Sequence, residues 1–303
     1  MSTQSFDIDS IIKNLTHEVE KVQDGLELAQ SLQRIKEIAL VYRGSDEMVS
    51  SSVLIENLKN EKEEFKIMSG WDSLDKILKG FRLQQLVTVS AATKSGKTSF
   101  LMDLTSRIKE FNTAWFPFEE SAEELLRKYI ERNEEPPHFF TPLSMKQITM
   151  NWLESKIVES IAKYGTKVVI IDHLDFLIPF SADNHSLRMG QAMRELKGLA
   201  KKWNICVFII CHLVKTRMEN QPTIEDLRGS SSIAQESDTV LLLWREMRRV
   251  SGQVEISNNL NVSVQANRRT GTTGNVKMTF INGKFFEKDW STNKDEVGGQ
   301  ILF

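Results

Sequence analysis

A short apolar strand, a Gly-Lys-Thr loop and an amphipathic helix follow one another near residue 90, and this order constrains the fold most strongly. The run from Leu86 to Val89 is apolar, and the loop from Ala91 to Thr98 reads Ala-Ala-Thr-Lys-Ser-Gly-Lys-Thr. This is the strand-loop-helix context of a P-loop, in which consecutive backbone N–H groups and a helix N-terminus surround a phosphate. We therefore expect an α/β core that binds a nucleotide.

The P-loop predicts a role for several of its side chains. Lys97 places a positive charge at the β and γ phosphates of ATP, and the Thr98 hydroxyl is a ligand for Mg²⁺. Gly96 lets the backbone approach the phosphates closely. The predicted nucleotide-binding residues of the loop are Ala92, Thr93, Lys94, Ser95, Gly96, Lys97, Thr98 and Ser99.

Apolar or β-branched runs alternate with helical periods through the middle of the chain. The predicted strands are residues 86–89, 113–116, 167–171 and 205–210, and the helices begin at Lys97, Ser121 and about Leu187. This rhythm predicts a mostly parallel sheet with helices on both faces. Four later strands follow without long helices between them, at residues 239–244, 261–266, 276–281 and 284–287. With the hairpin signal Asn282-Gly283, they predict antiparallel strands at the end of the sheet.

The first 64 residues are predicted to be helical. One apolar stripe has the three-and-four spacing of a helix, with Gly25 as its soft point: Ile8, Ile11, Ile12, Leu15, Val19, Val22, Leu26, Leu32 and Ile35. A second, shorter patch surrounds Leu54, and the charge run 61–64 precedes a boundary near residue 65. The predicted division is a helical segment 1–64, an α/β domain 65–290 and a flexible tail 291–303. The stripe packs within the chain or docks on a neighbouring subunit, and the sequence leaves both open.

The charge balance limits the partners that the chain can have. Its 303 residues contain 39 Lys and Arg against 41 Asp and Glu, so no general basic field attracts nucleic acid and any DNA contact must be local. Cys206 and Cys211 lie in one apolar run, which predicts buried thiols rather than a disulfide or a zinc site. Without a secretory segment or an apolar run of about 18 residues, we expect a soluble, cytoplasmic protein.

A carboxylate ends the third predicted strand. Asp172 follows the apolar run Val168–Ile171, at the edge of the sheet that the P-loop also occupies. Burial of a carboxylate at such a position is costly unless the group is paired. Asp172 is therefore predicted to hold Mg²⁺ together with Thr98.

Three further segments resemble the DnaB-like replicative DNA helicases and the related phage primase-helicases and Twinkle-like helicases. They are the lead-in 69–81 (SGWDSLDKILKGF), the block 226–238 (DLRGSSSIAQESD) and the segment 265–274 (QANRRTGTTG). The resemblance covers about residues 65–287 and includes a P-loop that opens with Ala. It implies a RecA-like ATPase that forms a ring, hydrolyses ATP with Mg²⁺ and moves along single-stranded DNA.

The same resemblance implies catalytic roles at the strand ends. Glu119 matches the family's water-polarising carboxylate, and Glu120 is assigned to the start of the next helix. His212 matches the γ-phosphate sensor at the end of the last parallel strand before the Ser-rich block. Arg245 ends a strand after a Ser-rich turn and matches an arginine near the adenine.

Residues that act across a subunit boundary are also implied. Arg269 aligns with the arginine finger that reaches the ATP of a neighbouring subunit. Asn267 stands where the family has a lysine, so either Arg268 substitutes for that cation or hydrolysis is slower.

The resemblance places DNA on two weakly basic loops. These are residues 181–190, with Arg188, and residues 214–221, with Lys215 and Arg217. The expected partners are single-stranded DNA, further copies in a hexamer, and a primase, polymerase or helicase loader. A recombinase-like or regulatory ATPase without unwinding, and a nucleotide-dependent assembly module, remain alternatives. The mixture of features favours a phage or mobile-element source.

Overall fold

The computed structural model describes residues 8–19, 25–42, 48–60, 65–92, 95–132, 137–145, 148–178, 185–213, 221–227, 230–250 and 253–287. The described helices are α1 (Ile8–Val19), α2 (Gly25–Tyr42), α3 (Ser51–Asn60), α4 (Asp72–Leu78), α5 (Lys97–Arg107), α6 (Ala122–Glu131), α7 (Met150–Tyr164), α8 (His185–Lys202) and α9 (Ser230–Glu236), with 3-10 turns η1 (Leu174–Leu177) and η2 (Ile224–Asp226). The strands are β1 (Leu86–Ala91), β2 (Thr113–Pro117), β3 (Phe139–Phe140), β4 (Val168–Asp172), β5 (Cys206–His212), β6 (Thr239–Val250), β7 (Gln253–Asn267), β8 (Gly274–Ile281) and β9 (Lys284–Glu287).

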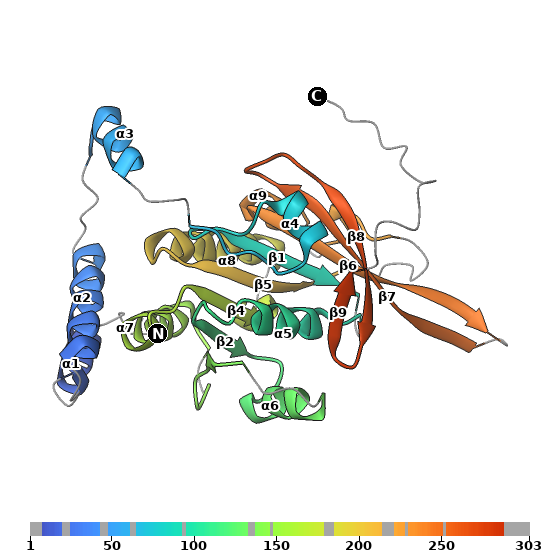
Figure 1. The fold of residues 1–303 in the computed structure, drawn as a ribbon, viewed down its shortest axis with the longest axis horizontal. Coiled ribbons are helices and arrows are strands. Elements are labelled where there is room, and N and C mark those ends of the chain that lie inside the picture. Colours follow the sequence, from blue (N-terminus) through green and yellow to red (C-terminus); the bar gives the residue numbers. More distant parts are fainter. Residues whose placement is uncertain are drawn as a thin grey trace.

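The described strands form one nine-stranded sheet in the order β3-β2-β4-β5-β1-β6-β7-β8-β9 (Figure 1). The strands from β3 to β6 are parallel, and β7, β8 and β9 continue the sheet in antiparallel pairing. This confirms the predicted α/β class with a mostly parallel sheet and antiparallel C-terminal strands. After β1 the chain crosses to β2, on one side of β1, and β6 is added later on the other side of β1. The strand order therefore reverses at β1. Ligands of open α/β sheets bind at the carboxyl ends of strands beside such a switch.

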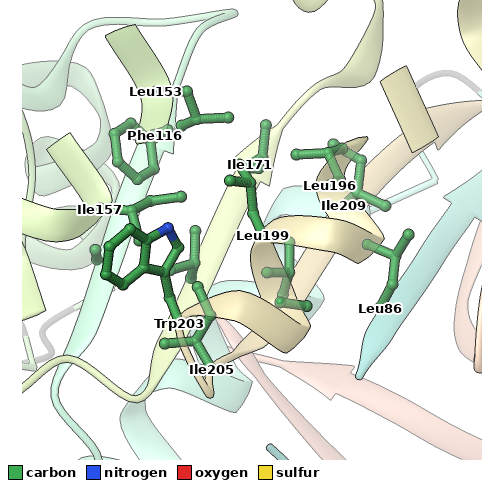
Figure 2. Close-up of a cluster of buried hydrophobic side chains, with 14 of the residues drawn as sticks. Leu86, Phe116, Leu153, Ile157, Ile171, Leu196, Leu199, Trp203, Ile205 and Ile209 are labelled. Atoms are coloured by element: carbon green, nitrogen blue, oxygen red, sulfur yellow. The ribbon is translucent and has the colours of Figure 1, made fainter. Parts of the chain in front are cut away.

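Each face of the sheet is covered by its own set of helices, because successive strand residues point to opposite faces. On one face α7 and α8 contribute Leu153, Ile157 and Leu196, which pack with Ile171 and Ile209 (Figure 2). On the other face α4, α5 and α6 pack against the alternate strand residues. Complete burial of one such side chain stabilises the fold by about 1.5–3 kcal/mol.

The N-terminal helices α1 and α2 pack against α7 of their own chain. Leu15, Val19, Ile35 and Ile38 are buried in the same core cluster as α7. For these residues the structure therefore supports packing within the chain. Leu32 is 47% exposed, contrary to the predicted stripe. The reason is that α2 is a separate helix, which begins at Gly25. The residue spacing counted from α1 therefore does not determine which face of α2 is buried.

Helix α3 lies away from the sheet (Figure 1). Its apolar side chains Val53, Leu54, Ile55 and Leu58 are 44–66% exposed. The helical patch predicted around Leu54 is confirmed, and its apolar side chains remain open to solvent.

Several predicted boundaries were wrong. The Ser-rich turn is helix α9, and β6 runs to Val250 instead of ending near Trp244, because β7 pairs with it along its length with a register irregularity after Arg245. Part of the predicted DNA loop 181–190 is helix, since α8 begins at His185. Helices α4 and α7 and strand β3 were not predicted.

Other local predictions were confirmed. Cys206 and Cys211 are buried free thiols on β5. Asn282 and Gly283 have φ of 49° and 89°, the left-handed conformation of a tight hairpin turn between β8 and β9. Among the helices of the described ranges, none combines the length and apolar character that crossing a membrane requires.

Candidate active site

The carboxyl ends of neighbouring strands meet at one edge of the sheet. Pro117 at the end of β2 pairs with Asp172 at the end of β4, and Ala91 at the end of β1 pairs with His212 at the end of β5. The backbone N–H of Glu119 donates to the carbonyl of Asp172 at 3.1 Å. The structure thus brings Glu119, Asp172 and His212 to the edge from which the P-loop begins.

The P-loop joins β1 to α5 through Gly96, whose φ of +95° strongly favours glycine. Lys97 is only 8% exposed, and its Nζ donates to the carbonyls of Ala91 at 3.1 Å and Ala92 at 3.4 Å. Desolvation lowers the pKa of Lys97, against the opposing effect of the charges on Asp172 and Glu119. Its amine is therefore a buried cation directed at the loop. The predicted residues Thr93 and Lys94 lie outside the described residues.

Thr98 and Asp172 form a direct pair. The Thr98 hydroxyl donates to Asp172 Oδ2 at 2.7 Å. The other oxygen, Oδ1, is buried and has no hydrogen-bond partner among the described residues. Desolvation raises the pKa of Asp172 to about 6, and the bond from Thr98 opposes this effect. A hydroxyl beside a carboxylate oxygen without a partner suits a hard divalent cation such as Mg²⁺.

Glu119 and Glu120 have different surroundings. Glu119 is exposed at the strand edge, whereas Glu120 forms an ion pair with Lys128 on α6. The assignment of Glu120 to the first helical turn was wrong, because Ser121 is the N-cap of α6 and accepts a bond from the Glu124 N–H. Glu120 is thus held by its ion pair, and Glu119 is the carboxylate that solvent and ligand can reach.

A second histidine, His173, was not predicted from the sequence and lies beside His212. The rings of His173 and His212 are 4.2 Å apart at 74°, and His173 is 9% exposed. Ligand atoms of Glu119, His173 and His212 all lie within 4.8 Å of one another. The sequence could have indicated His173 only by its position, because it directly follows Asp172 at the end of β4.

Arg245 and Arg132 flank the P-loop on the side of the β8–β9 hairpin. Arg245 lies 5.1 Å and Arg132 5.9 Å from the centre of the Phe280 ring. Burial lowers the pKa of Arg245, and a Cβ on Gly96 would lie 3.3 Å from its guanidinium. Arg132 donates to Ser99 Oγ at 2.9 Å and was missed, because an arginine at a helix end carries no distinguishing sequence signal.

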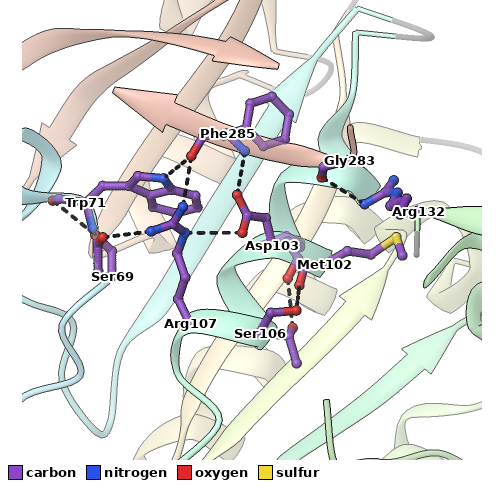
Figure 3. A network of polar contacts seen from close by, with 12 residues as sticks. Ser69, Trp71, Met102, Asp103, Ser106, Arg107, Arg132, Gly283 and Phe285 are labelled. Carbon is purple, nitrogen blue, oxygen red and sulfur yellow. Dashed lines mark hydrogen bonds and ion pairs between the residues drawn. The ribbon is translucent and has the colours of Figure 1, made fainter. Parts of the chain in front are cut away.

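The lead-in segment and α5 are joined to β9 by a polar network (Figure 3). The Phe285 N–H donates to Asp103 at 2.7 Å, and the Phe285 carbonyl accepts bonds of 2.9 Å from both Trp71 and Arg107. Arg107 also donates to the Gly70 carbonyl and pairs with Asp103. The lead-in therefore fixes the P-loop helix against the hairpin.

Arg269, the predicted arginine finger, lies near the amino ends of the parallel strands, at the edge of the sheet opposite the P-loop. The Arg268 N–H donates to the Asp238 carbonyl, and the Asp238 N–H donates to the carbonyl of Leu86, the first residue of β1. The length of β1 separates this edge from the P-loop by about 17 Å. Arg268 and Arg269 are exposed there and do not belong to the P-loop site of their own chain.

The turn that carries Arg269 explains why an uncharged residue can occupy position 267. Asn267 is 6% exposed, and its Oδ1 accepts bonds from the Arg269 and Thr270 N–H groups at 3.3 and 3.4 Å. Its Nδ2 donates to the Leu78 carbonyl at 3.5 Å. Asn267 therefore shapes the turn instead of supplying a cation.

Of the predicted DNA residues, only Arg188 lies in the described part of the chain. It is exposed on the first turns of α8, which starts on the P-loop side of the sheet. Lys215 and Arg217 lie outside the described residues.

Comparison with known proteins matches this architecture. The profile of the DnaB-like helicase C terminal domain matches residues 66–137 and 140–287. Replicative DNA helicase DnaC of Bacillus subtilis (strain 168) is 25% identical over 89% of this chain and 65% of its own length. Replicative DNA helicase DnaB of Geobacillus stearothermophilus is 26% identical over 78% of this chain and 59% of its own length. A solved DnaB-like replicative helicase, studied with its interactions with primase, aligns over 92% of this chain and 75% of its own, with a TM-score of 0.67 and 18% identity.

Proposed function

Because the chain belongs to the DnaB-like helicase C-terminal domain family, we propose that it is an ATP-hydrolysing motor that moves along single-stranded DNA and unwinds duplex DNA. The chain spans less than two thirds of the length of the two curated relatives described above. The observation that carries the proposal is the convergence of Lys97, Thr98, Asp172 and Glu119 at one edge of the sheet. A cation, a metal-binding pair and an exposed carboxylate there are the groups that phosphoryl transfer to water requires.

Each residue has a distinct part in the proposed reaction. Thr98 and Asp172 would hold Mg²⁺, which neutralises charge on the phosphates when bound. Lys97 binds the β and γ phosphates, and Glu119 orients a water for in-line attack and accepts its proton. His212 lies on the same edge, where it can sense the γ-phosphate. Arg245, with Arg268 from another subunit, completes the proposed nucleotide contacts.

Assembly of several copies follows from the position of Arg269. Because this residue lies at the sheet edge opposite the P-loop, it can serve as an arginine finger only for a second copy. Contacts of this head-to-tail kind form a ring where the rotation between neighbours closes and a filament where it does not, and we propose a closed hexamer. The exposed apolar side of α3, rather than the stripe of α1 and α2, is our candidate for docking on the neighbour.

DNA is proposed to follow the ring channel through weak contacts summed over the subunits. Arg188 on α8, together with Lys215 and Arg217, would contact phosphates without reading sequence. The net charge of -2 is consistent with a local contact of this kind rather than a basic surface. A primase, polymerase or loader is the class of protein partner that such a motor would meet.

Hydrolysis and unwinding by the purified chain test the proposal. We expect Mg²⁺-dependent phosphate release that single-stranded DNA stimulates, and strand separation of a forked duplex. Lys97→Ala should abolish both activities, whereas Lys109→Ala, at an exposed lysine just beyond α5, should retain them. Assembled wild-type chain that releases no phosphate with or without DNA would overturn the proposal. Hydrolysis without unwinding would favour a recombinase-like or regulatory ATPase instead.

A further inference from the structure

We propose that Glu119, His173 and His212 form a binding site for a transition metal ion such as Zn²⁺, separate from the Thr98–Asp172 pair, and that its occupancy inhibits ATP hydrolysis. The inhibitory part of this inference rests on the proposed function. The metal-binding part rests on the geometry of the side chains alone.

The side chains converge from three strand ends. Glu119 follows β2, His173 follows β4 and His212 ends β5, and their ligand atoms lie within 4.8 Å of one another. Ligands around a tetrahedral Zn²⁺ are about 2.1 Å from the ion and hence about 3.4 Å apart. Because Glu119 is exposed, rotation of its side chain can shorten its own distances to the two rings.

His173 gives an independent indication of a ligand. The ring is 9% exposed, and its Nδ1 is buried without a hydrogen-bond partner among the described residues. Oδ2 of Asp175 is 3.7 Å from Nδ1, beyond hydrogen-bonding distance. Buried polar atoms are normally paired, so the vicinity of this ring suits a cation that binds imidazole.

The donor set selects the class of metal. Two imidazoles and one carboxylate with an open fourth position are a zinc ligand set, and imidazole also suits Cu²⁺, Ni²⁺ and Co²⁺. Mg²⁺ prefers oxygen ligands in octahedral geometry, which Thr98 and Asp172 offer instead. The two sites therefore differ in chemistry although they are neighbours.

Inhibition follows because one ligand has a second task. Glu119 is the carboxylate proposed to orient water, and coordination to a transition metal would occupy its oxygens. His212, proposed to sense the γ-phosphate, would be held by the same ion. A chain with the metal bound is therefore expected to bind ATP and to hydrolyse it slowly.

Cobalt spectroscopy tests the metal site without nucleotide. The tag-free full chain is titrated with Co²⁺, and we expect visible absorption that saturates at one ion per chain, disappears on addition of Zn²⁺ and persists in millimolar Mg²⁺. Removal of a residue that only hydrogen-bonds to a metal ligand already weakens metal affinity about 10–100-fold. Removal of a ligand itself, as in His173→Gln or His212→Gln, should therefore weaken Co²⁺ binding by at least about tenfold. His138→Gln, at an exposed histidine outside the cluster, is the matched control and should bind as the wild type does.

Asp172→Asn distinguishes the two sites, because it should keep the cobalt spectrum if the ion is bound by the histidines. Absence of saturable absorption, unchanged affinity in both histidine variants, or loss of the spectrum in Asp172→Asn would overturn the metal site. For the inhibition, Zn²⁺ should block hydrolysis by the wild type at concentrations at least about tenfold lower than for His173→Gln. Equal sensitivity would overturn the inhibitory role. Failure of the motor proposal would appear separately, as absence of hydrolysis before any Zn²⁺ is added.

Discussion

Asp172 is 2% exposed, and its carboxyl group lies near the charges of Glu119 and Glu120. Its pKa is raised from 3.8 to about 6, so the folded state holds the proton more tightly than the unfolded state does. Burial of the charged form therefore lowers stability above about pH 6, and this cost disappears below about pH 4. We predict that Asp172→Asn abolishes Mg²⁺-dependent hydrolysis and stabilises the metal-free chain at pH 8 by up to about 2–3 kcal/mol.

Urea unfolding at pH 8 and at pH 5 measures this effect. The difference between Asp172→Asn and the wild type should be larger at pH 8. Asp175→Asn, at a partly exposed carboxylate on the following 3-10 turn, is the control and should show no such gain. A less stable Asp172→Asn at pH 8 would show that the charge is compensated in the fold.

The neighbouring carboxylates allow a matched comparison. Glu119→Gln is expected to slow hydrolysis by about 10²–10⁴ while ATP binding persists, since general base catalysis contributes this much. Glu120→Gln removes the partner of Lys128 and one of the charges near Asp172, and should change hydrolysis less than tenfold, because the Lys128 side chain is 43% exposed and an ion pair open to water contributes little. Single-turnover hydrolysis and binding of a fluorescent ATP analogue separate the two steps. The opposite ranking of the variants would make Glu120 the base.

Among single residues, those at the strand ends were predicted from the sequence. Asp172 and His212 lie at the edge where the order of strands and loops had placed them. His173 and Arg132 were not predicted, because their importance depends on which side chains face them. The ring of His212 and the hydroxyl of Ser99 come from distant segments.

Among the elements, the β8–β9 hairpin is joined to the P-loop helix α5 by polar contacts of Phe285. Asp103 is 3% exposed, accepts from the Phe285 N–H and pairs with Arg107 (Figure 3). Asp103→Ala leaves a buried N–H without its partner, so we predict a loss of about 1–3 kcal/mol in the free energy of unfolding. ATP affinity should fall as well, because Phe280 of this hairpin faces Arg245.

Denaturation and nucleotide titration of Asp103→Ala check both effects. Glu110→Ala, at an exposed residue just beyond α5, serves as the control and should change neither quantity by more than the error of measurement. Unchanged stability in Asp103→Ala would mean that the hairpin is held mainly by its apolar contacts.

The elements that the sequence predicted are those with strong apolar periodicity. Strands β1, β2, β4 and β5 were found because they are buried on both faces and read as continuous apolar runs. Strand β3 has only residues Phe139 and Phe140 and depends on pairing with β2, which no local pattern encodes. Helix α9 was missed because serines favour turns, and tertiary contacts with α8 decide its conformation.

For the assembled molecule, α3 is the element whose role is tested most directly. Leu54 and Leu58 are 50% and 66% exposed in the single chain, so their replacement should not affect its stability. We predict that Leu54→Ser with Leu58→Ser reduces ring formation in the presence of ATPγS, because exposed apolar surface of this kind is normally covered by a partner. Native mass spectrometry measures the change, and Glu56→Ser on the same helix is the control. Ring formation by the double variant at the wild-type level would exclude α3 as the docking element.

The position of Arg269 makes ATP hydrolysis a property of the whole ring, because the finger and the P-loop of one chain lie at opposite edges of its sheet. Arg269→Ala should slow hydrolysis by about 10³–10⁵. Glu119→Gln should slow it by about 10²–10⁴, because it lacks the general base. When both variants are mixed before assembly, about a quarter of the head-to-tail interfaces pair an intact Glu119 with an intact Arg269, so part of the activity should return. Native mass spectrometry verifies that the rings are mixed. If mixed rings remain as inactive as either variant alone, Arg269 does not act across the interface, and the edge of the sheet opposite the P-loop has no part in the reaction.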